Sequence, residues 1–453
     1  MGRQAATEEL FYNFRIENHI PANHLLRQLD KILCFDRLRT ALSSYYSRTG
    51  RPSIDPELML RMMLIGYAYG IRSERRLCEE VHLNLAYRWF CRLGLEGSVP
   101  NHSTFSKNRY GRFQESGIYR MFFEDVVRQC QAAGLVGGEG FAVDGTVIQA
   151  DVNYARQVLS AEDLQRAVNH ESVSRPVQAY LDALDKAVPE EDKTVHKSPP
   201  ARISLTDPQA AWSYKNKQAG FAYLSNYLID TDHAVIVDVE ATPARYTEEI
   251  IAARSMITRA AERHNLNPER LAADKLYGTG AFLSWLIERK VEPHIPVIDR
   301  LAQQGVLSRD AFAYDEESDS FTCPEGKKLP CIGVSPARRY YAPKIEDCEG
   351  CLRKPDCTTG LVRKLTRHRD EAARDRVRAL QNTEAFKQSA RKRKKVEMLF
   401  AHLKQQFRFR RLKLRGLSGA TEECLLAATI QNLRRLVRLR PPNITHMRLQ
   451  SAV

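Results

Sequence analysis

The chain contains no long uninterrupted hydrophobic run. Its longest apolar stretch, residues 58–71, includes Arg61 and is shorter than the roughly 20 residues that a membrane-spanning helix needs. The N-terminal residues also lack the basic start and apolar core of a secretory signal peptide. We therefore expect a cytoplasmic protein with no membrane partner, in which the ten cysteines are reduced.

Acidic residues are too few to balance the basic ones. The 453 residues include 55 Asp and Glu against 69 Lys and Arg, a formal net charge of +14. Hydrophobic residues make up 43%, which excludes a disordered chain and allows about two to four domains. The positive charge is concentrated, because residues 391–417 contain eleven basic side chains and one acid, Glu397.

Such a basic run predicts contact with DNA phosphates, and a solvated helical face is the alternative. The residues of the run that we expect to bind DNA are Arg393, Lys394, Lys395, Lys404, Arg408, Arg410 and Arg411.

Residues 1–135 have the pattern of a helical region. Asp55 and Pro56 form an N-cap and a first turn ahead of apolar residues at helical spacing. Ser73 is expected to begin a second helix, and residues 85–93 a third.

A further helix is expected over residues 105–113, with Ser103 or Thr104 as its cap. It carries Lys107 and Arg109, and several short basic helices favour a DNA-binding domain of the helix-turn-helix kind. An ordinary helical bundle is the alternative.

From Gly137 the pattern changes to strands and helices. A hairpin or kinked strand is expected over residues 141–148, around Asp144 and Gly145. The later pattern predicts strands over 221–229, 234–240, 270–273 and 291–297, and helices over 247–264 and 281–290. This order predicts an α+β fold, a mixed sheet flanked by helices.

Three acids stand at positions that suit metal chemistry. Asp144 and Asp274 each end a short apolar strand, and adjacent strand ends bring such carboxylates together. Glu397 shares a polar stripe with Arg393 and Lys404, at ~100° per residue of helix. Together, in a cationic protein, the acids fit phosphodiester chemistry with two Mg²⁺ ions.

Each of these acids also has a structural alternative. The two aspartates suit turns, and Glu397 suits a surface ion pair with Arg393. Asp238 and Glu240 lie opposite buried valines on an alternating strand, so we expect them to be structural.

A series of short strings follows along residues 45–440: 51–67, NLAYRWF at 84–90, VPNHST at 99–104, VDGTVI at 143–148, SLTDP at 204–208, ADKLYG at 273–278, and the stripe of Arg393, Glu397 and Lys404. In this order they resemble the insertion-sequence transposases of the DDE type, in particular the group named after insertion sequence eleven eighty-two. Members of that family usually carry a tyrosine three residues before the arginine, where this chain has Ala390.

The resemblance implies an RNase H-like core in which Asp144, Asp274 and Glu397 hold two Mg²⁺ ions, with Mn²⁺ as a substitute. It implies double-stranded DNA as partner, both element ends and target, with no small-molecule cofactor. We further expect a homodimer on DNA and a nucleoid-associated bacterial protein.

An insertion is expected between the second and third acids. Asp274 and Glu397 are 123 residues apart, whereas a helix and a strand between them need only about 20. Half of the ten cysteines fall within 35 residues of this stretch: Cys323, Cys331, Cys348, Cys351 and Cys357. They predict a subdomain held by structural Zn²⁺ on four thiols, and reduced thiols without metal are the alternative.

The expected organisation is a helical DNA-binding domain (1–135), the first part of the catalytic core (136–298, loose and polar over 155–202), a cysteine-rich insertion (299–380), the final core helices with the basic run (381–440) and a tail (441–453). The predicted function is a DNA transposase that cleaves element ends and joins the freed 3′-hydroxyl to target DNA. A non-catalytic DNA-binding regulator and a nuclease without strand transfer are the alternatives.

Overall fold

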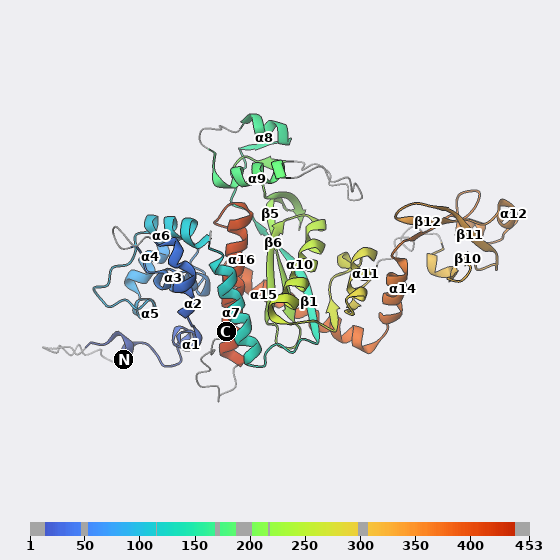
Figure 1. Ribbon diagram of the computed structural model, residues 1–453. Coiled ribbons are helices and arrows are strands. Elements are labelled where there is room, and N and C mark those ends of the chain that lie inside the picture. Colours follow the sequence, from blue (N-terminus) through green and yellow to red (C-terminus); the bar gives the residue numbers. More distant parts are fainter. Residues whose placement is uncertain are drawn as a thin grey trace, which may run out of the picture. The chain divides into compact units, whose positions relative to one another are not determined.

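A computed structural model of the chain describes residues 14–46, 53–114, 116–167, 173–186, 202–215, 218–297 and 307–439 (Figure 1). The expected tail (441–453) and residues 187–201 of the loose polar segment lie outside the described residues. The chain divides into two compact units, the first made of residues 1–137, 145–264 and 396–453, and the second of 138–144 and 265–395.

Both units mix helices with strands, which confirms the α+β class. Two elements run from one unit into the other, namely strand β1 (Gly140–Gln149) and helix α15 (Glu384–Gln405). Within the described ranges, no helix is both long and apolar enough to cross a bilayer.

The first unit begins with a group of helices: η1 (Ile16–His19), α1 (Leu25–Ile32), α2 (Asp36–Leu42), η2 (Ser43–Tyr45), α3 (Pro56–Ala68), α4 (Glu74–Leu83), α5 (Leu85–Phe90), α6 (His102–Asn108), the π-helix η3 (Arg109–Phe113) and α7 (Ile118–Ala132). Asp55 and Ser73 cap α3 and α4 as predicted. The predicted cap of α6 is wrong: Asn101 fills that place, and its side chain accepts a hydrogen bond from the Ser103 amide at 2.9 Å.

The rest of the first unit combines an antiparallel sheet with long helices. β5 (Gln218–Asp230) pairs with β4 (Ala211–Lys215) and with β6 (Ile236–Pro243), and β2 (Gln157–Val158) pairs with β3 (Ile203–Ser204). The helices are α8 (Ala161–Ala167), α9 (Arg175–Lys186), α10 (Tyr246–His264) and α16 (Gly416–Leu439), of which α10 and α16 both pack against β6. The predicted strand pair and the helix over 247–264 are confirmed.

The Asp144-Gly145 pair lies inside one continuous strand, so a hairpin at this point is wrong. Gly145 serves a close approach, because a Cβ there would come within 2.7 Å of the Asn226 Oδ1. Asn226 is fully buried and donates to the Glu240 carbonyl at 3.1 Å and to the Thr242 hydroxyl at 3.0 Å. The glycine therefore leaves room for a side chain that is held in place by β6.

Helix α16 crosses the core of the first unit and carries buried acids. Glu422 accepts a hydrogen bond from the Arg109 guanidinium, which also bonds Glu74 at 3.1 Å and the Tyr67 hydroxyl at 3.2 Å. Burial raises the pKa of Glu422 to about 7, and Arg109 acts in the opposite direction. Arg109 is 7% exposed and holds α16 against the N-terminal helices, and its DNA contact stays a prediction.

The second unit contains the parallel strands of the six-stranded mixed sheet to which β4, β5 and β6 also belong, and one separate sheet. The start of β1 pairs in parallel with β7 (Arg270–Ala272), which pairs in parallel with β8 (Glu292–His294). Around them lie η4 (Lys275–Tyr277), α11 (Gly280–Glu288) and α14 (Glu371–Leu380). The second sheet, antiparallel in the order β13-β12-β11-β10-β9, lies within the predicted insertion.

The elements of this small-sheet subdomain are η6 (Arg309–Ala311), β9 (Ala313–Asp315), β10 (Ser320–Thr322), β11 (Lys328–Val334), β12 (Arg338–Tyr341), α12 (Ile345–Cys348), α13 (Lys354–Cys357) and β13 (Leu365–His368).

Replacing Arg109 should destabilise the protein. Arg109→Met leaves Glu422 buried without its cationic partner, which costs about 3–5 kcal/mol. We expect a marked fall in the thermal unfolding midpoint, measured by circular dichroism. Lys107→Met is the matched control, because this neighbouring cation is exposed. An Arg109→Met protein that unfolds with the wild-type midpoint would contradict the structural role.

Adding one methyl group at Gly145 should also destabilise the fold. Gly145→Ala forces its Cβ against the held Asn226 side chain, and overpacking of this kind costs about 1–3 kcal/mol. Gly111→Ala is the control, since a Cβ at Gly111 meets nothing within 4 Å. In urea unfolding, Gly145→Ala should have a lower midpoint than Gly111→Ala. Equal midpoints would show that the Asn226 side chain can move away from the added methyl group without cost.

Candidate active site

Two of the predicted acids follow paired positions on neighbouring strands. Asp274 comes after the end of β7, whereas Asp144 lies within β1, so the predicted strand end at Asp144 is wrong. Ala142 on β1 is the register partner of Ala272 on β7, and the strands are parallel. Asp144 and Asp274 each follow two residues later. Because neighbouring strands lie about 4.8 Å apart, this register places the backbone of both aspartates beside the carboxyl end of β7.

Asp274 is held in a fixed position by the backbone that follows it. It is the N-cap of η4, and its Oδ1 accepts a hydrogen bond from the Leu276 amide at 2.5 Å. Asp274 therefore has the turn-forming role that was the predicted alternative. This role does not exclude metal binding by the same carboxylate. Gly278 allows the tight return of the chain, because a Cβ there would come within 2.7 Å of the Pro296 carbonyl.

Arg393 on α15 reaches the first aspartate. Its Nη1 lies 3.2 Å from the Asp144 Oδ2, and the two side chains are 22% and 20% exposed. One turn earlier on the same helix, the Ser389 hydroxyl lies 2.7 Å from Nδ1 of His294, which is buried at the end of β8. The His294 ring also packs on Phe386, so the start of α15 is tied to the strand next to β7.

The His294–Ser389 contact was not predicted from the sequence. Both residues are common polar types, and nothing in the spacing of His294, in a short strand, connects it to a helix 95 residues later. The one local signal is the Glu292-Pro293-His294 strand itself, in which the Glu292 carboxylate lies 2.6 Å from the His294 ring.

Glu397 and Lys404 continue the polar stripe of α15. Glu397 lies one helical turn after Arg393 and is exposed, and Lys404 is half-buried. Both belong to the first unit, whereas Asp144, Asp274 and Arg393 belong to the second. The helical register of the stripe agrees with its prediction from the sequence.

The predicted DNA-binding residues differ in exposure. Lys107, Lys394, Arg408, Arg410 and Arg411 are exposed, and Arg393, Lys395 and Lys404 are half-buried. Arg411 and Arg415 both form ion pairs with Asp151, at 3.3 and 3.1 Å. The loop after α15 is thereby held beside the end of β1, where the Leu412 amide donates to the Gln149 carbonyl at 2.8 Å.

Asp238 and Glu240 have structural partners, as expected. Arg259 on α10 bonds both carboxylates at 2.7 Å, and Arg120 on α7 bonds Asp238. These acids tie two helices to β6.

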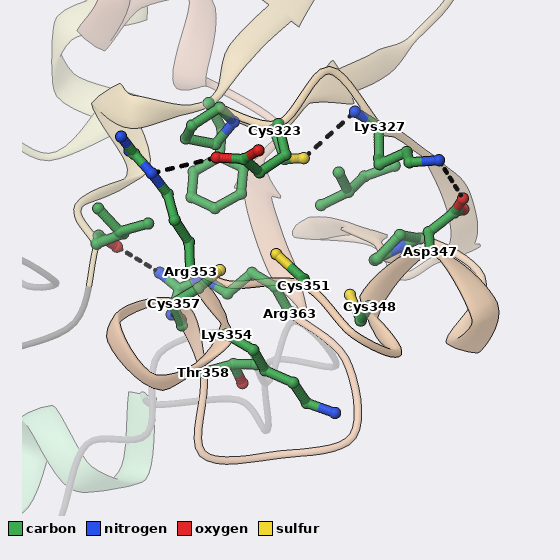
Figure 2. Close-up of a pocket in the computed structure, with 16 residues that line it drawn as sticks. Cys323, Lys327, Asp347, Cys348, Cys351, Arg353, Lys354, Cys357, Thr358 and Arg363 are labelled. Carbon is green, nitrogen blue, oxygen red and sulfur yellow. Dashed lines mark hydrogen bonds and ion pairs between the residues drawn. The ribbon is translucent and has the colours of Figure 1, made fainter.

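Four of the five clustered cysteines line one pocket in the small-sheet subdomain: Cys323, Cys348, Cys351 and Cys357 (Figure 2). Burial raises the pKa of the Cys357 thiol, Arg363 lowers it, and the other three thiols raise it further. All ten cysteines of the chain are free thiols.

No metal centre is already assembled in the part of the chain that the structure describes. Within it, no three His, Cys, Asp or Glu side chains form a group that could hold an ion. The donor chemistry of the strand-end site nevertheless suits Mg²⁺, because it offers carboxylate oxygens at a half-buried sheet edge.

Comparison with known families gives two matches. Residues 14–110 match a family model described as "Transposase domain (DUF772)", and residues 322–437 match one described as "Transposase DDE domain". The second match includes Arg393, Glu397 and Lys404, and both aspartates lie outside it. Both matched models describe transposase domains, so two separate parts of the chain are similar to transposases.

Proposed function

We propose that this protein is a DNA transposase of the insertion sequence eleven eighty-two group, with an RNase H-like catalytic core. It cleaves the ends of its element by metal-dependent phosphodiester hydrolysis and joins the freed 3′-hydroxyl to target DNA. The observation that supports the proposal is the parallel register of β1 and β7, because Asp144 and Asp274 each follow a pair of register partners by two residues. The family matches add independent support.

Asp144, Asp274 and Glu397 would hold the divalent cations. Two bound Mg²⁺ ions, or Mn²⁺ in their place, would activate the attacking oxygen and stabilise the leaving oxygen. The carboxylates supply the hard oxygen ligands that these cations prefer. Approach of Glu397 to the two aspartates is part of this proposal.

Arg393 has two roles in the proposed site. Its ion pair with Asp144 balances the negative charge that two adjacent carboxylates concentrate at the sheet edge. Its guanidinium also suits a DNA phosphate, since it presents several donors in a plane. His294 and Ser389 act as positioning residues, because they tie the turn before Arg393 to β8.

The exposed cations of the basic run would bind the DNA backbone. Lys394, Arg408 and Arg410 carry charge at the surface and supply binding that does not depend on sequence. Lys404, on the polar stripe, would contact DNA next to Glu397. We expect a homodimer on paired element ends and an association with the nucleoid.

Asp144→Asn should abolish cleavage while DNA binding remains. The amide keeps the shape of the side chain and loses its charge, so the rate should fall by at least about 100-fold, the order of loss when one electrostatic stabiliser is removed. Cleavage of a DNA fragment that carries the element end is measured in Mg²⁺, with binding measured by gel shift. Glu240→Gln is the control, because Glu240 pairs with Arg259 on α10. A wild-type cleavage rate in Asp144→Asn would refute the site.

The same assay separates the proposed function from its alternatives. Joined products with the wild-type protein support a transposase. Cleavage without joining indicates a nuclease, and binding without cleavage indicates a regulator.

Substitutions in the basic run should weaken DNA binding in a salt-dependent way. Lys394→Gln and Arg408→Gln should each reduce the slope of log K against log salt by about one phosphate contact. The slope is measured by fluorescence anisotropy between low and moderate salt. Arg166→Gln is the control, since Arg166 is an exposed cation outside the run. An equal effect of all three variants would mean that binding follows net charge alone.

A further inference from the structure

The small-sheet subdomain has a thin hydrophobic core. Its buried residues form one cluster of Phe312, Phe321, Leu329, Tyr341 and Leu365. Five buried side chains form a small hydrophobic core for a five-stranded sheet. Small folds with such cores usually gain stability from disulfides or a structural metal. Disulfides are absent from this subdomain, because its five cysteines are free thiols.

Four of those thiols come from separate turns to one pocket. Figure 2 shows Cys323 above the pocket, Cys348 and Cys351 on its right, and Cys357 on its left. The fifth, Cys331, lies on β11, where its sulfur faces the Gly333 carbonyl at 3.5 Å. The structure therefore shows which four cysteines share the pocket and which one lies outside it. The spacing of the cysteines in the sequence could not make this distinction.

The first turn brings a backbone donor to the Cys323 sulfur. After Cys323 the chain reverses through Gly326, whose φ is +76°. The Cys323 amide donates to the Lys327 carbonyl at 2.9 Å, and the Lys327 amide donates to the Cys323 sulfur at 3.3 Å. Such an N–H···S contact stabilises a thiolate and orients it as a ligand.

The second turn brings two cysteines together. Cys348 and Cys351 are separated by two residues, and Gly350 between them has a φ of +78°. This is the ligand spacing of structural zinc sites. Cys357 follows at the end of α13, one short helix later.

The charges around the pocket suit an anionic centre. Zn²⁺ on four thiolates carries a charge of about −2. Cations outnumber carboxylates on the pocket wall, where Lys327, Arg353, Lys354 and Arg363 stand against Glu325 and Asp347. Arg363 donates to the Cys357 carbonyl at 2.9 Å, which places a guanidinium beside the fourth thiol.

We propose that Cys323, Cys348, Cys351 and Cys357 bind one structural Zn²⁺ ion, and that Cys331 is not a ligand. The thiols line the pocket without forming a closed group, so binding requires rotation of their side chains and loss of their protons. The ion would join the turn after β10 to the two short helices between β12 and β13. The inference is independent of the proposed transposase activity.

The test is the metal content of the full-length protein, purified under reducing conditions without chelator from zinc-supplemented cells. Mass spectrometry of the metal should find about one zinc per chain in the wild type, as expected for a site with four cysteine ligands. Cys351→Ser should lose the zinc, and Cys331→Ser, the matched control from the same sheet, should keep it. Replacement of zinc by Co²⁺ in the wild type should give the visible spectrum of a tetrahedral tetrathiolate. This measurement tests the ligand set without depending on whether the variants fold.

Three results would overturn the proposal. One is a wild-type chain without zinc that also gives no tetrathiolate spectrum with Co²⁺. Another is the loss of zinc in Cys331→Ser while Cys351→Ser retains it. The third is a disulfide among the four thiols in freshly purified protein, found by mapping peptides after alkylation.

Discussion

The candidate site depends on the parallel pairing of β1 with β7. In this register two aspartates that are 130 residues apart in the sequence each follow a pair of register partners, Ala142 and Ala272, by two residues. The pairing of β1 with β7 therefore determines where Asp144 and Asp274 lie along their strands. Two adjacent negative charges repel each other, so the arrangement needs a counter-charge. Arg393 on α15 supplies the positive charge beside Asp144.

The start of α15 is attached to β8 through His294, whose Nε2 lies 2.6 Å from the Glu292 carboxylate. His294 is fully enclosed at the end of β8, and it reaches α15 through the Ser389 hydroxyl and the Phe386 ring. Because the helix is rigid, this attachment carries over to the next turn, where Arg393 stands. A buried histidine with a hydrogen-bond partner at each ring nitrogen has one favourable orientation, so it fixes the start of α15 relative to β8.

The sequence could predict what local pattern controls. The α+β class, the caps of α3 and α4, and the polar stripe of α15 all follow from periodicity and capping rules. It could not predict contacts between distant segments. Arg109 resembles Lys107 in the sequence, yet its partner Glu422 is 313 residues away and gives it a structural role. Gly145 likewise suggested a turn, because nothing in the local sequence shows that Asn226 lies against it.

The ion pair between Arg393 and Asp144 has a consequence for how the protein is made. A carboxylate that finds its counter-charge within the chain lets the sheet edge form before any divalent cation arrives. Biosynthesis of this part of the molecule then does not depend on the magnesium supply of the cell. Under the proposed function, a copy without bound cation would stay folded and inactive.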